Sequence, residues 1–255
     1  MRQLYESPDT YMIINSYRFS SGGGGGTGLD SNLVAWYDCI GDLNDNHGSL
    51  NWTENGTFSK AITDPFGNSN SACGGDGTTA QYGTQTDPAF DLTGDLSACC
   101  WIKARAAGDR CAEFLSKAGG SGNRGWDFGY RNSGGTDDVS IHLSSTGNWE
   151  YTENSNAWLA NGSWYHLGFS YDSSAREVKL YVDGALKQTD TNPSPTVPAS
   201  IYDSSDDMTL CGHNGGSDIV GNVDFCRIGI WSAVLAGTDF STIYNSGSDF
   251  RYSDI

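Results

Sequence analysis

The segment from Trp164 to Leu186, WYHLGFSYDSSAREVKLYVDGAL, decides the fold. Apolar and polar residues alternate through Trp164–Tyr171 and again through Glu177–Val182, which predicts two antiparallel strands joined by a turn. The dipeptide Asp183-Gly184 is a strong hairpin signal, because both central residues of a type I′ turn need positive φ. Residues Ala185–Gln188 are therefore expected to form the return strand, and the whole segment predicts a β-meander.

The same alternation recurs along the chain, with turn residues about every 8–12 positions, a spacing typical of a β-sandwich or barrel. Further strands are expected at Leu33–Tyr37, Ser97–Lys103, Cys111–Ser116, Gly125–Tyr130, Val139–Leu143, Trp149–Thr152, Met208–Cys211 and Val223–Trp231.

One short helix is expected near the end of the chain. Thr238 is its predicted N-cap, Asp239 lies in the first turn, Phe240 and Ile243 are its apolar residues, and Gly247 follows its end.

Composition agrees with this pattern and excludes several classes of protein. The 255 residues include 34 Gly, and only 18% are charged, which suits short strands and tight turns better than a helical bundle. The net charge of −17 provides no electrostatic basis for binding nucleic acid or an anionic membrane. No segment approaches the roughly 20 apolar residues of a membrane span, so we expect no membrane insertion.

Seven cysteines, an odd number, leave at least one thiol unpaired. Several lie in apolar strand-like segments such as SACCWIK and VDFCRIGIW, and no C-x-x-C motif occurs. We expect mostly reduced thiols in the core, which favours assembly in a reducing compartment, with one or two disulfides as the alternative. The beginning of the sequence lacks the apolar region of a secretory signal.

Residues 1–28 differ from the remainder of the chain. Apolar and aromatic side chains are followed by the uninterrupted glycine run 22–26, which cannot pack a core and behaves as a flexible joint. We predict an extended arm that docks onto another surface, with a frayed terminus as the alternative. The anchoring residues expected in this arm are Tyr5, Tyr11, Ile13, Tyr17 and Phe19.

Four segments together resemble the laminin-G-like, concanavalin A-like lectin and glucanase domain. They are LVAWYDCIGDLNDNHGSL with its N-D-x-x-G loop, LSACCWIKARAA, the Trp164–Leu186 hairpin, and VDFCRIGIWSAVLAGTDFSTIYNSG. The resemblance implies an all-β jelly-roll sandwich of two antiparallel sheets over residues 29–255, with one short C-terminal helix. It also implies a binding or adhesion module, although the fold alone does not determine the function.

The arm has a separate resemblance to the start of many tailed-phage virion proteins, carried by Ser16-Tyr-Arg-Phe-Ser20 before the glycine run. This implies a virion structural or decoration protein, assembled in the host cytoplasm and displayed at the virion surface. Its expected partners are capsid or tail proteins bound through the arm and cell-surface glycans bound by the sandwich, and association of several copies is left open. The alternative is an extracellular bacterial lectin module.

Hydrolases of this superfamily carry a strand motif Glu-x-Asp-x-x-Glu, which this chain lacks. The nearest pair, Glu150 and Glu153, would point to opposite faces of one strand and could not flank one glycosidic bond. No G-x-S-x-G elbow is present, and His166 in the hairpin is best explained as a packed core residue. We therefore predict a protein without enzymatic activity, with a glycoside hydrolase as the weaker alternative.

Calcium is the one cofactor that the sequence suggests, because hard cations bind carboxylates on loops. Asp76 matches the family's Phe-Asp-Gly turn, and Asp224 matches the Asp of its closing strand, where the family's neighbouring Glu is Phe225 here. These resemblances imply a structural Ca²⁺ ligated by Asp76 and Asp224, with turn or capping roles as the alternative.

Sugar binding needs aromatic faces together with planar polar groups. Trp149 and Tyr151 are two residues apart and are expected to share one strand face. The alternative is that these rings fill the core of the sandwich. The predicted ligand-binding residues are Trp126, Tyr130, Trp149, Tyr151, Trp158 and Asn214.

Overall fold

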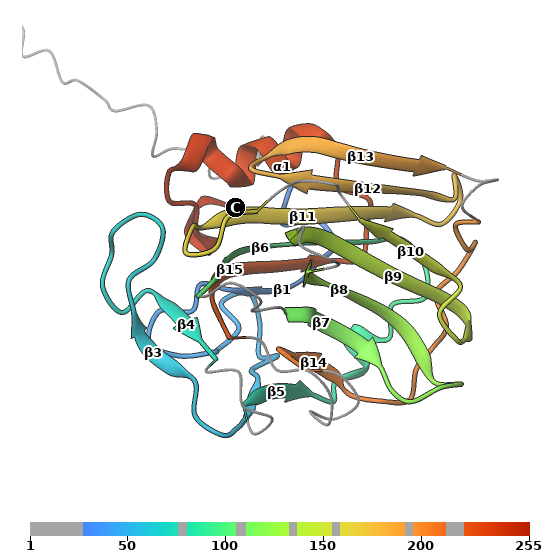
Figure 1. The fold of residues 1–255 in the computed structure, drawn as a ribbon, viewed down its shortest axis with the longest axis horizontal. Coiled ribbons are helices and arrows are strands. Elements are labelled where there is room, and N and C mark those ends of the chain that lie inside the picture. Colours follow the sequence, from blue (N-terminus) through green and yellow to red (C-terminus); the bar gives the residue numbers. More distant parts are fainter. Residues whose placement is uncertain are drawn as a thin grey trace, which may run out of the picture.

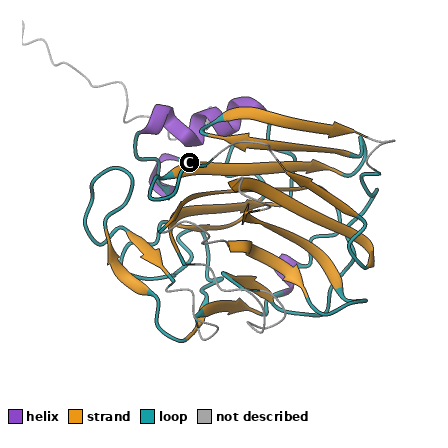
Figure 2. Ribbon diagram, in the orientation of Figure 1, coloured by secondary structure: helices purple, strands orange, loops and turns teal. Residues whose placement is uncertain are grey.

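The computed structural model describes residues 28–75, 81–105, 111–132, 137–154, 159–191, 196–212 and 222–255. Within these ranges the chain forms two antiparallel sheets of eight and seven strands, with little helix (Figures 1 and 2). The predicted all-β sandwich is therefore confirmed. Several predicted functional residues lie outside the described residues and stay predictions: Tyr5, Tyr11, Ile13, Tyr17, Phe19, Asp76, Trp158 and Asn214.

The first sheet contains the hairpin that decides the fold. Its strand order is β13-β12-β11-β6-β15-β4-β3, with β1 also pairing with β15. The bounds are β13 Ala185–Thr191, β12 Glu177–Val182, β11 Tyr165–Asp172, β6 Leu96–Ala104, β15 Val223–Trp231, β4 Ala72–Gly74, β3 Ser59–Ile62 and β1 Leu33–Tyr37. Asp183 and Gly184 both have positive φ, as the hairpin prediction requires.

The second sheet has the order β10-β9-β8-β7-β14-β5-β2. The bounds are β10 Tyr151–Asn154, β9 Asp137–Gly147, β8 Arg124–Asn132, β7 Cys111–Ala118, β14 Met208–Leu210, β5 Tyr82–Gln85 and β2 Thr53–Asn55. Figure 1 shows this sheet stacked against the first one. The rings of Trp126 and Phe128 meet Phe169 of the first sheet at centroid distances of 6.0 and 4.9 Å, so the main core lies between the sheets.

A second, smaller core explains why β6 is buried on both faces. Helix α1 (Gly237–Tyr244) covers the outer face of the first sheet, and its Phe240 ring stacks on Tyr181 at 4.1 Å. A Cβ on Gly168 would come within 2.6 Å of the Phe240 ring, so glycine is what allows the helix to approach the sheet this closely. Short 3₁₀ turns lie at Pro88–Phe90, Asn245–Gly247 and Tyr252–Asp254.

The start of α1 corrects one detail of the prediction. The N-cap is Ala236 rather than Thr238, and the Asp239 carboxylate accepts a hydrogen bond from the Ala236 N–H at 2.8 Å. Phe240 and Ile243 are buried as expected. Within the ranges given above, every helix falls short of the length and hydropathy needed to span a lipid bilayer.

Strand β15 changes neighbours in the middle of its length. Its residues Asp224 and Phe225 pair with β4, whereas Ile228–Trp231 pair with β1. On the other side, the register with β6 shifts between Cys226 and Gly229, which is a β-bulge. Arg227 occupies this bulge with a φ of 51°, and its side chain is 1% exposed.

The Arg227 guanidinium joins three segments: the end of β1, the β3–β4 loop and the C-terminal segment. Nη1 donates to the carbonyl oxygens of Asp38 (2.6 Å) and Ser71 (3.1 Å), which lie at the end of β1 and the start of β4. Nη2 donates to Asp64 Oδ2, and Nε donates to Asp249 Oδ1, both at 2.9 Å. A buried charge is tolerated only when it is paired and its donors are satisfied, and both conditions hold here.

The N-D-x-x-G loop is organised by a single carboxylate. Asp45 Oδ1 accepts from the backbone N–H groups of Trp36 and His47, and Oδ2 accepts from those of Gly48 and Leu50. Asp45 is only 8% exposed, so these four donors replace the water that a carboxylate otherwise needs.

The six cysteines with described side chains, Cys39, Cys73, Cys99, Cys100, Cys211 and Cys226, are all buried in the sandwich. Cys39, Cys73, Cys99 and Cys226 are free thiols, which agrees with the expectation of reduced core thiols. Burial raises the pKa of the Cys99 thiol to about 12 and raises the pKa of Cys39 and Cys226 well above the ordinary value. These thiols are therefore protonated at neutral pH.

His166 is packed as predicted, between aromatic rings under α1. It is fully buried beside Trp101 (5.5 Å) and Tyr244 (6.1 Å), and neither ring nitrogen has a hydrogen-bond partner among the residues that the structure describes. Burial alone lowers its pKa to about 3, because the charged imidazolium would lose its hydration.

Replacing Arg227 with Met should lower the free energy of unfolding by about 3–5 kcal/mol, because Asp64 would remain buried without its cation. Urea denaturation followed by fluorescence measures this loss. Lys60→Met, which removes a partly exposed ion pair with Glu54, is the control and should cost about 0–1 kcal/mol. Equal losses in the two variants would contradict the role given to Arg227.

His166 should make the fold sensitive to mild acid. In the unfolded chain the imidazole takes up a proton near its ordinary pKa of about 6.5, whereas in the folded chain it does so only near pH 3. Stability should therefore fall as the pH decreases from 6.5 towards 3, by about 1.4 kcal/mol per pH unit from this residue. Urea denaturation of His166→Phe between pH 7 and 4.5 should give a shallower decline, and parallel curves would rule this origin out.

Candidate functional site

Four connections meet at one end of the sandwich, at the right in Figure 1. The β9–β10 hairpin contacts the β7–β8 hairpin, because Asn148 Oδ1 accepts from the Ser121 hydroxyl (2.8 Å) and the Gly122 N–H (3.1 Å). The segment 196–207 is tied to β9 by the Tyr202 N–H, which donates to the Ser144 carbonyl at 2.6 Å. These bonds fix the loops relative to one another and to the sheets.

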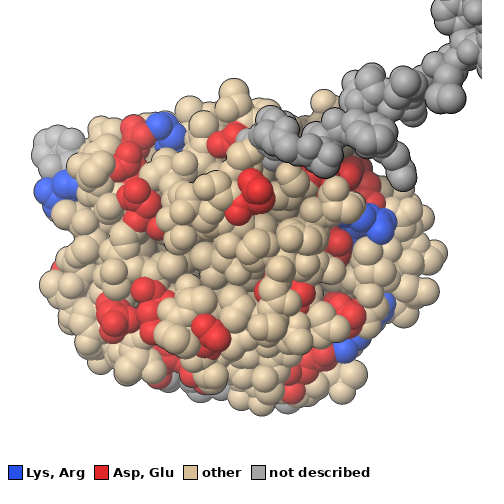
Figure 3. Space-filling model, turned by 180° about the vertical axis from the view of Figure 1, so that it is seen from behind, with Lys and Arg blue, Asp and Glu red and all other residues tan. Residues whose placement is uncertain are grey.

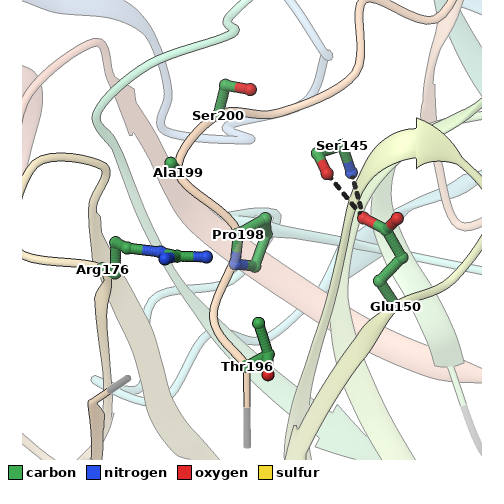
Figure 4. Close-up of a pocket in the computed structure, with 7 residues that line it drawn as sticks. All are labelled: Ser145, Glu150, Arg176, Thr196, Pro198, Ala199 and Ser200. Atoms are coloured by element: carbon green, nitrogen blue, oxygen red, sulfur yellow. Dashed lines mark hydrogen bonds between the residues drawn. The ribbon is translucent and has the colours of Figure 1, made fainter. Parts of the chain in front are cut away.

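A pocket of about 350 Å³ opens between these loops. Figure 4 shows Arg176 entering from one side and Glu150 standing on the other, with Pro198 between them. Its lining comes from the β9–β10 hairpin, the β11–β12 turn and the segment 196–200, and consists of Ser145, Glu150, Arg176, Thr196, Pro198, Ala199 and Ser200.

Glu150 is held in the ionised form. Its Oε2 accepts from both the N–H and the hydroxyl of Ser145 at 2.7 Å, drawn as dashes in Figure 4. Desolvation by itself would raise the pKa of Glu150, but these bonds and one from the Thr146 hydroxyl lower that pKa below its ordinary value. The pocket thus presents a carboxylate that can only accept hydrogen bonds.

Arg176 is positioned by the turn that precedes β12. Asp172 Oδ1 accepts from the Ala175 N–H and the Ser174 hydroxyl, which closes the turn, and Arg176 follows with a φ of 54°. Its Nε donates to the Val197 carbonyl at 2.9 Å. The guanidinium is therefore anchored to the segment that forms the floor of the pocket.

A second cavity of about 220 Å³ lies beside residues 203–207. Lys117 crosses it, with Nζ 2.7 Å from Asp91 Oδ1 and 2.6 Å from the Asp206 carbonyl oxygen. Its lining is acidic: Thr86, Asp91, Lys117, Asp203, Ser204, Ser205, Asp206 and Asp207. Among the residues that the structure describes, no three His, Cys, Asp or Glu side chains gather closely enough to hold a metal ion.

Polar residues occupy the outer face of the second sheet. The strand registers place one such row across all seven strands: Thr53, Thr84, Thr209, Ser116, Asp127, His142 and Thr152. His142 Nδ1 lies 2.7 Å from Asp127 Oδ1, and both side chains are almost fully buried. Trp149 packs on His142 at 5.3 Å, and Arg124 lies 5.4 Å from the Trp149 ring centroid.

The predicted aromatic platform needs correction. Trp126, Tyr130 and Tyr151 are at most 2% exposed and belong to the main core, so their rings cannot stack on a sugar. Trp149 precedes β10 and contacts the outer face, whereas Tyr151 points inward, so the two do not share a face. Trp149 alone is a half-buried ring beside the loops. The alternation correctly placed Trp126 and Tyr130 on the same face of β8, but it does not show whether that face points to the core or to solvent.

Asp224 occupies a different environment from the one expected for a calcium ligand. Its Oδ2 lies 2.7 Å from Lys103 Nζ, and its Oδ1 lies 2.6 Å from Arg105 Nη2, in a side chain that is 6% exposed. These cations already satisfy the carboxylate, which gives Asp224 a structural role in joining β15 to β6. Asp76 lies outside the described residues, so the calcium prediction as a whole stays a prediction.

The sequence did not predict the pocket. Glu150 was considered only together with Glu153, as a possible pair of hydrolase carboxylates. Arg176 and the segment 196–200 come from turns distant in sequence from Glu150, so no motif spacing links them. The weak signal available was an Arg at the end of an Asp-Ser-Ser turn.

This two-sheet sandwich with a polar pocket among its end loops defines a lectin-like class of domain. The chain belongs to the concanavalin A-like lectin/glucanases superfamily, whose Laminin_G_3 model matches residues 76–239. This agrees with the resemblance seen in the sequence. A search of curated proteins finds no match.

Solved structures share the fold at low sequence identity. Domain 4 of the arabinanase AbnA from Geobacillus stearothermophilus, in complex with arabinotriose, aligns with a TM-score of 0.61 and 19% identity over 84% of this chain and 98% of that one. The binding domain of Paraclostridial Mosquitocidal Protein 1 aligns with a TM-score of 0.64 and 12% identity over 86% of this chain.

Botulinum neurotoxin type C, whose cell entry depends on interaction with two ganglioside molecules, aligns with a TM-score of 0.62 and 15% identity over 88% of this chain. This chain covers 53% of each of the two toxin chains, so it corresponds to about half of their length. These likenesses are evidence for the fold alone.

Proposed function

We propose that this chain is a non-enzymatic glycan-binding module that is displayed on a phage particle through its N-terminal arm. The observation that carries the binding part is the pocket in which Glu150 and Arg176 stand on opposite walls, each fixed by its own hydrogen bonds. Its volume of about 350 Å³ lies in the usual range of small-ligand sites.

The chemistry of the pocket suits a sugar. Glu150 accepts hydrogen bonds from hydroxyl groups, Arg176 donates them, and the hydroxyl of Ser200 can do either. The Pro198 ring adds a small apolar surface between the charged walls. Superfamily membership and the arabinotriose-bound and ganglioside-binding neighbours support the same class of ligand.

The pocket supplies one carboxylate, whereas glycoside hydrolysis generally uses two that face each other across the bond. This supports binding without cleavage. The glycoside hydrolase alternative would need a second acid, and the acidic cavity beside Lys117 is the place to look for it.

The display part of the proposal rests on the sequence of residues 1–28 and on the thiols. Free, buried cysteines suit a protein that assembles in a reducing cytoplasm. The net charge of −17 would keep neighbouring copies on a particle from associating. A secreted lectin module without particle attachment is the alternative.

Blocking the pocket should abolish glycan binding. We expect the wild-type chain to bind a subset of a glycan array and Ala199→Trp, which fills the pocket with an indole, to lose at least about 90% of that signal. Ala61→Trp, at an exposed position on β3, is the matched control and should bind normally. Binding by the blocked variant, or release of reducing sugar from bound glycans, would contradict the proposal.

Removing residues 1–28 should abolish attachment to the particle. We expect the full chain to co-sediment with the virions of the phage that encodes it, and the shortened chain to stay in the supernatant while keeping its melting temperature. Immunoblotting of both fractions measures this. Retention of the shortened chain on particles would show that the arm is not the anchor.

A further inference from the structure

Most of the Lys and Arg side chains that the structure describes already pair with a carboxylate. The face seen in Figure 3 carries far more Asp and Glu than Lys and Arg. Seven of these side chains are in ion pairs, whereas Arg124, Arg176 and Lys187 form no ion pair with any residue in the described part of the chain. Arg124 lies against the Trp149 ring and Lys187 is exposed on β13, whereas Arg176 lines the pocket of about 350 Å³.

The Arg176 side chain is already ordered for binding. Its Nε is bonded to the Val197 carbonyl, and no hydrogen bond joins Nη1 or Nη2 to the described residues. Figure 4 shows the guanidinium end directed into the pocket. Two N–H groups on one edge of a guanidinium match the two oxygens of a carboxylate, and anchoring the Nε in advance reduces the entropy lost on binding.

The opposite wall requires the opposite chemistry. Glu150 is ionised and cannot donate, so it calls for a hydroxyl or N–H group on the ligand. Although they face the same cavity, Glu150 and Arg176 form no ion pair with each other. A ligand that bridges them therefore needs an anionic group at one end and hydrogen-bond donors at the other.

We propose that the pocket takes a sugar unit that carries a carboxylate, with the carboxylate on Nη1 and Nη2 of Arg176 and a ring hydroxyl or amide N–H on Glu150. This inference rests on the proposed glycan-binding function and specifies the substrate class of the same site. The acidic molecule repels a continuous polyanion, so the ligand is an isolated or terminal acidic unit.

The test is a panel of oligosaccharides ending in glucuronate, galacturonate or N-acetylneuraminate, each paired with its carboxyl-reduced counterpart. By calorimetry or biolayer interferometry, the wild-type chain should bind the acidic member of at least one pair about tenfold more tightly. Arg176→Gln should bring the two members of that pair to equal affinity. Lys187→Gln removes the same charge outside the pocket and should keep the preference.

Glu150→Gln provides a second, independent measurement. It replaces an acceptor by an amide of the same shape and should weaken both members of the pair by a similar factor, because it touches the donor end of the sugar. Thermal melts of all three variants confirm that they are folded.

The outcomes separate the two proposals. If glycans bind in the array and are lost in Ala199→Trp, but the acidic and reduced forms bind equally, the acidic-sugar inference is wrong and the binding function stands. A preference that survives Arg176→Gln would place the carboxylate elsewhere and also overturn the inference. If neither the array nor the panel shows binding, the proposed function itself fails.

Discussion

The buried guanidinium of Arg227 holds three separate parts of the chain together. Arg227 lies in β15 at the point where the pairing partner of this strand changes from β4 to β1. Arg227 bonds to the end of β1, to the loop before β4 and to the C-terminal segment that carries Asp249. Because β15 also pairs with β6, the position of this one side chain fixes the relative placement of four strands in the first sheet. Of the loops that form the pocket end, the β11–β12 turn belongs to this first sheet, whereas the β7–β8 and β9–β10 hairpins belong to the second.

Much of this framework could be predicted from alternation and turn chemistry. Leu33–Tyr37, Glu177–Val182 and Val223–Trp231 were predicted with the boundaries that the structure has, because each is a continuous apolar or alternating segment bounded by turn residues. The three-residue strands at Thr53–Asn55 and Ala72–Gly74 are too short to show a period, and only their pairing partners identify them. The prediction placed the N-cap of α1 at Thr238 because a hydroxyl side chain commonly caps a helix. The N-cap is instead Ala236, whose backbone N–H donates to the Asp239 carboxylate.

The candidate site was less predictable for a physical reason. Period-two patterning shows that Trp126 and Tyr130 share a face, but only the packing of the two sheets shows that this face is the inner one. The pocket depends on contacts between turns separated by tens of residues, such as the bond from Arg176 Nε to Val197. None of these residues belongs to a recognisable sequence motif. They form a site only because the folded loops bring Glu150 and Arg176 to the same pocket.

The buried thiols have a practical consequence for anyone who handles this protein. Because burial keeps Cys39, Cys99 and Cys226 protonated and shielded, an alkylating reagent can reach them only after the sandwich opens. The rate at which these thiols are alkylated therefore measures how often the native structure opens and its two sheets separate.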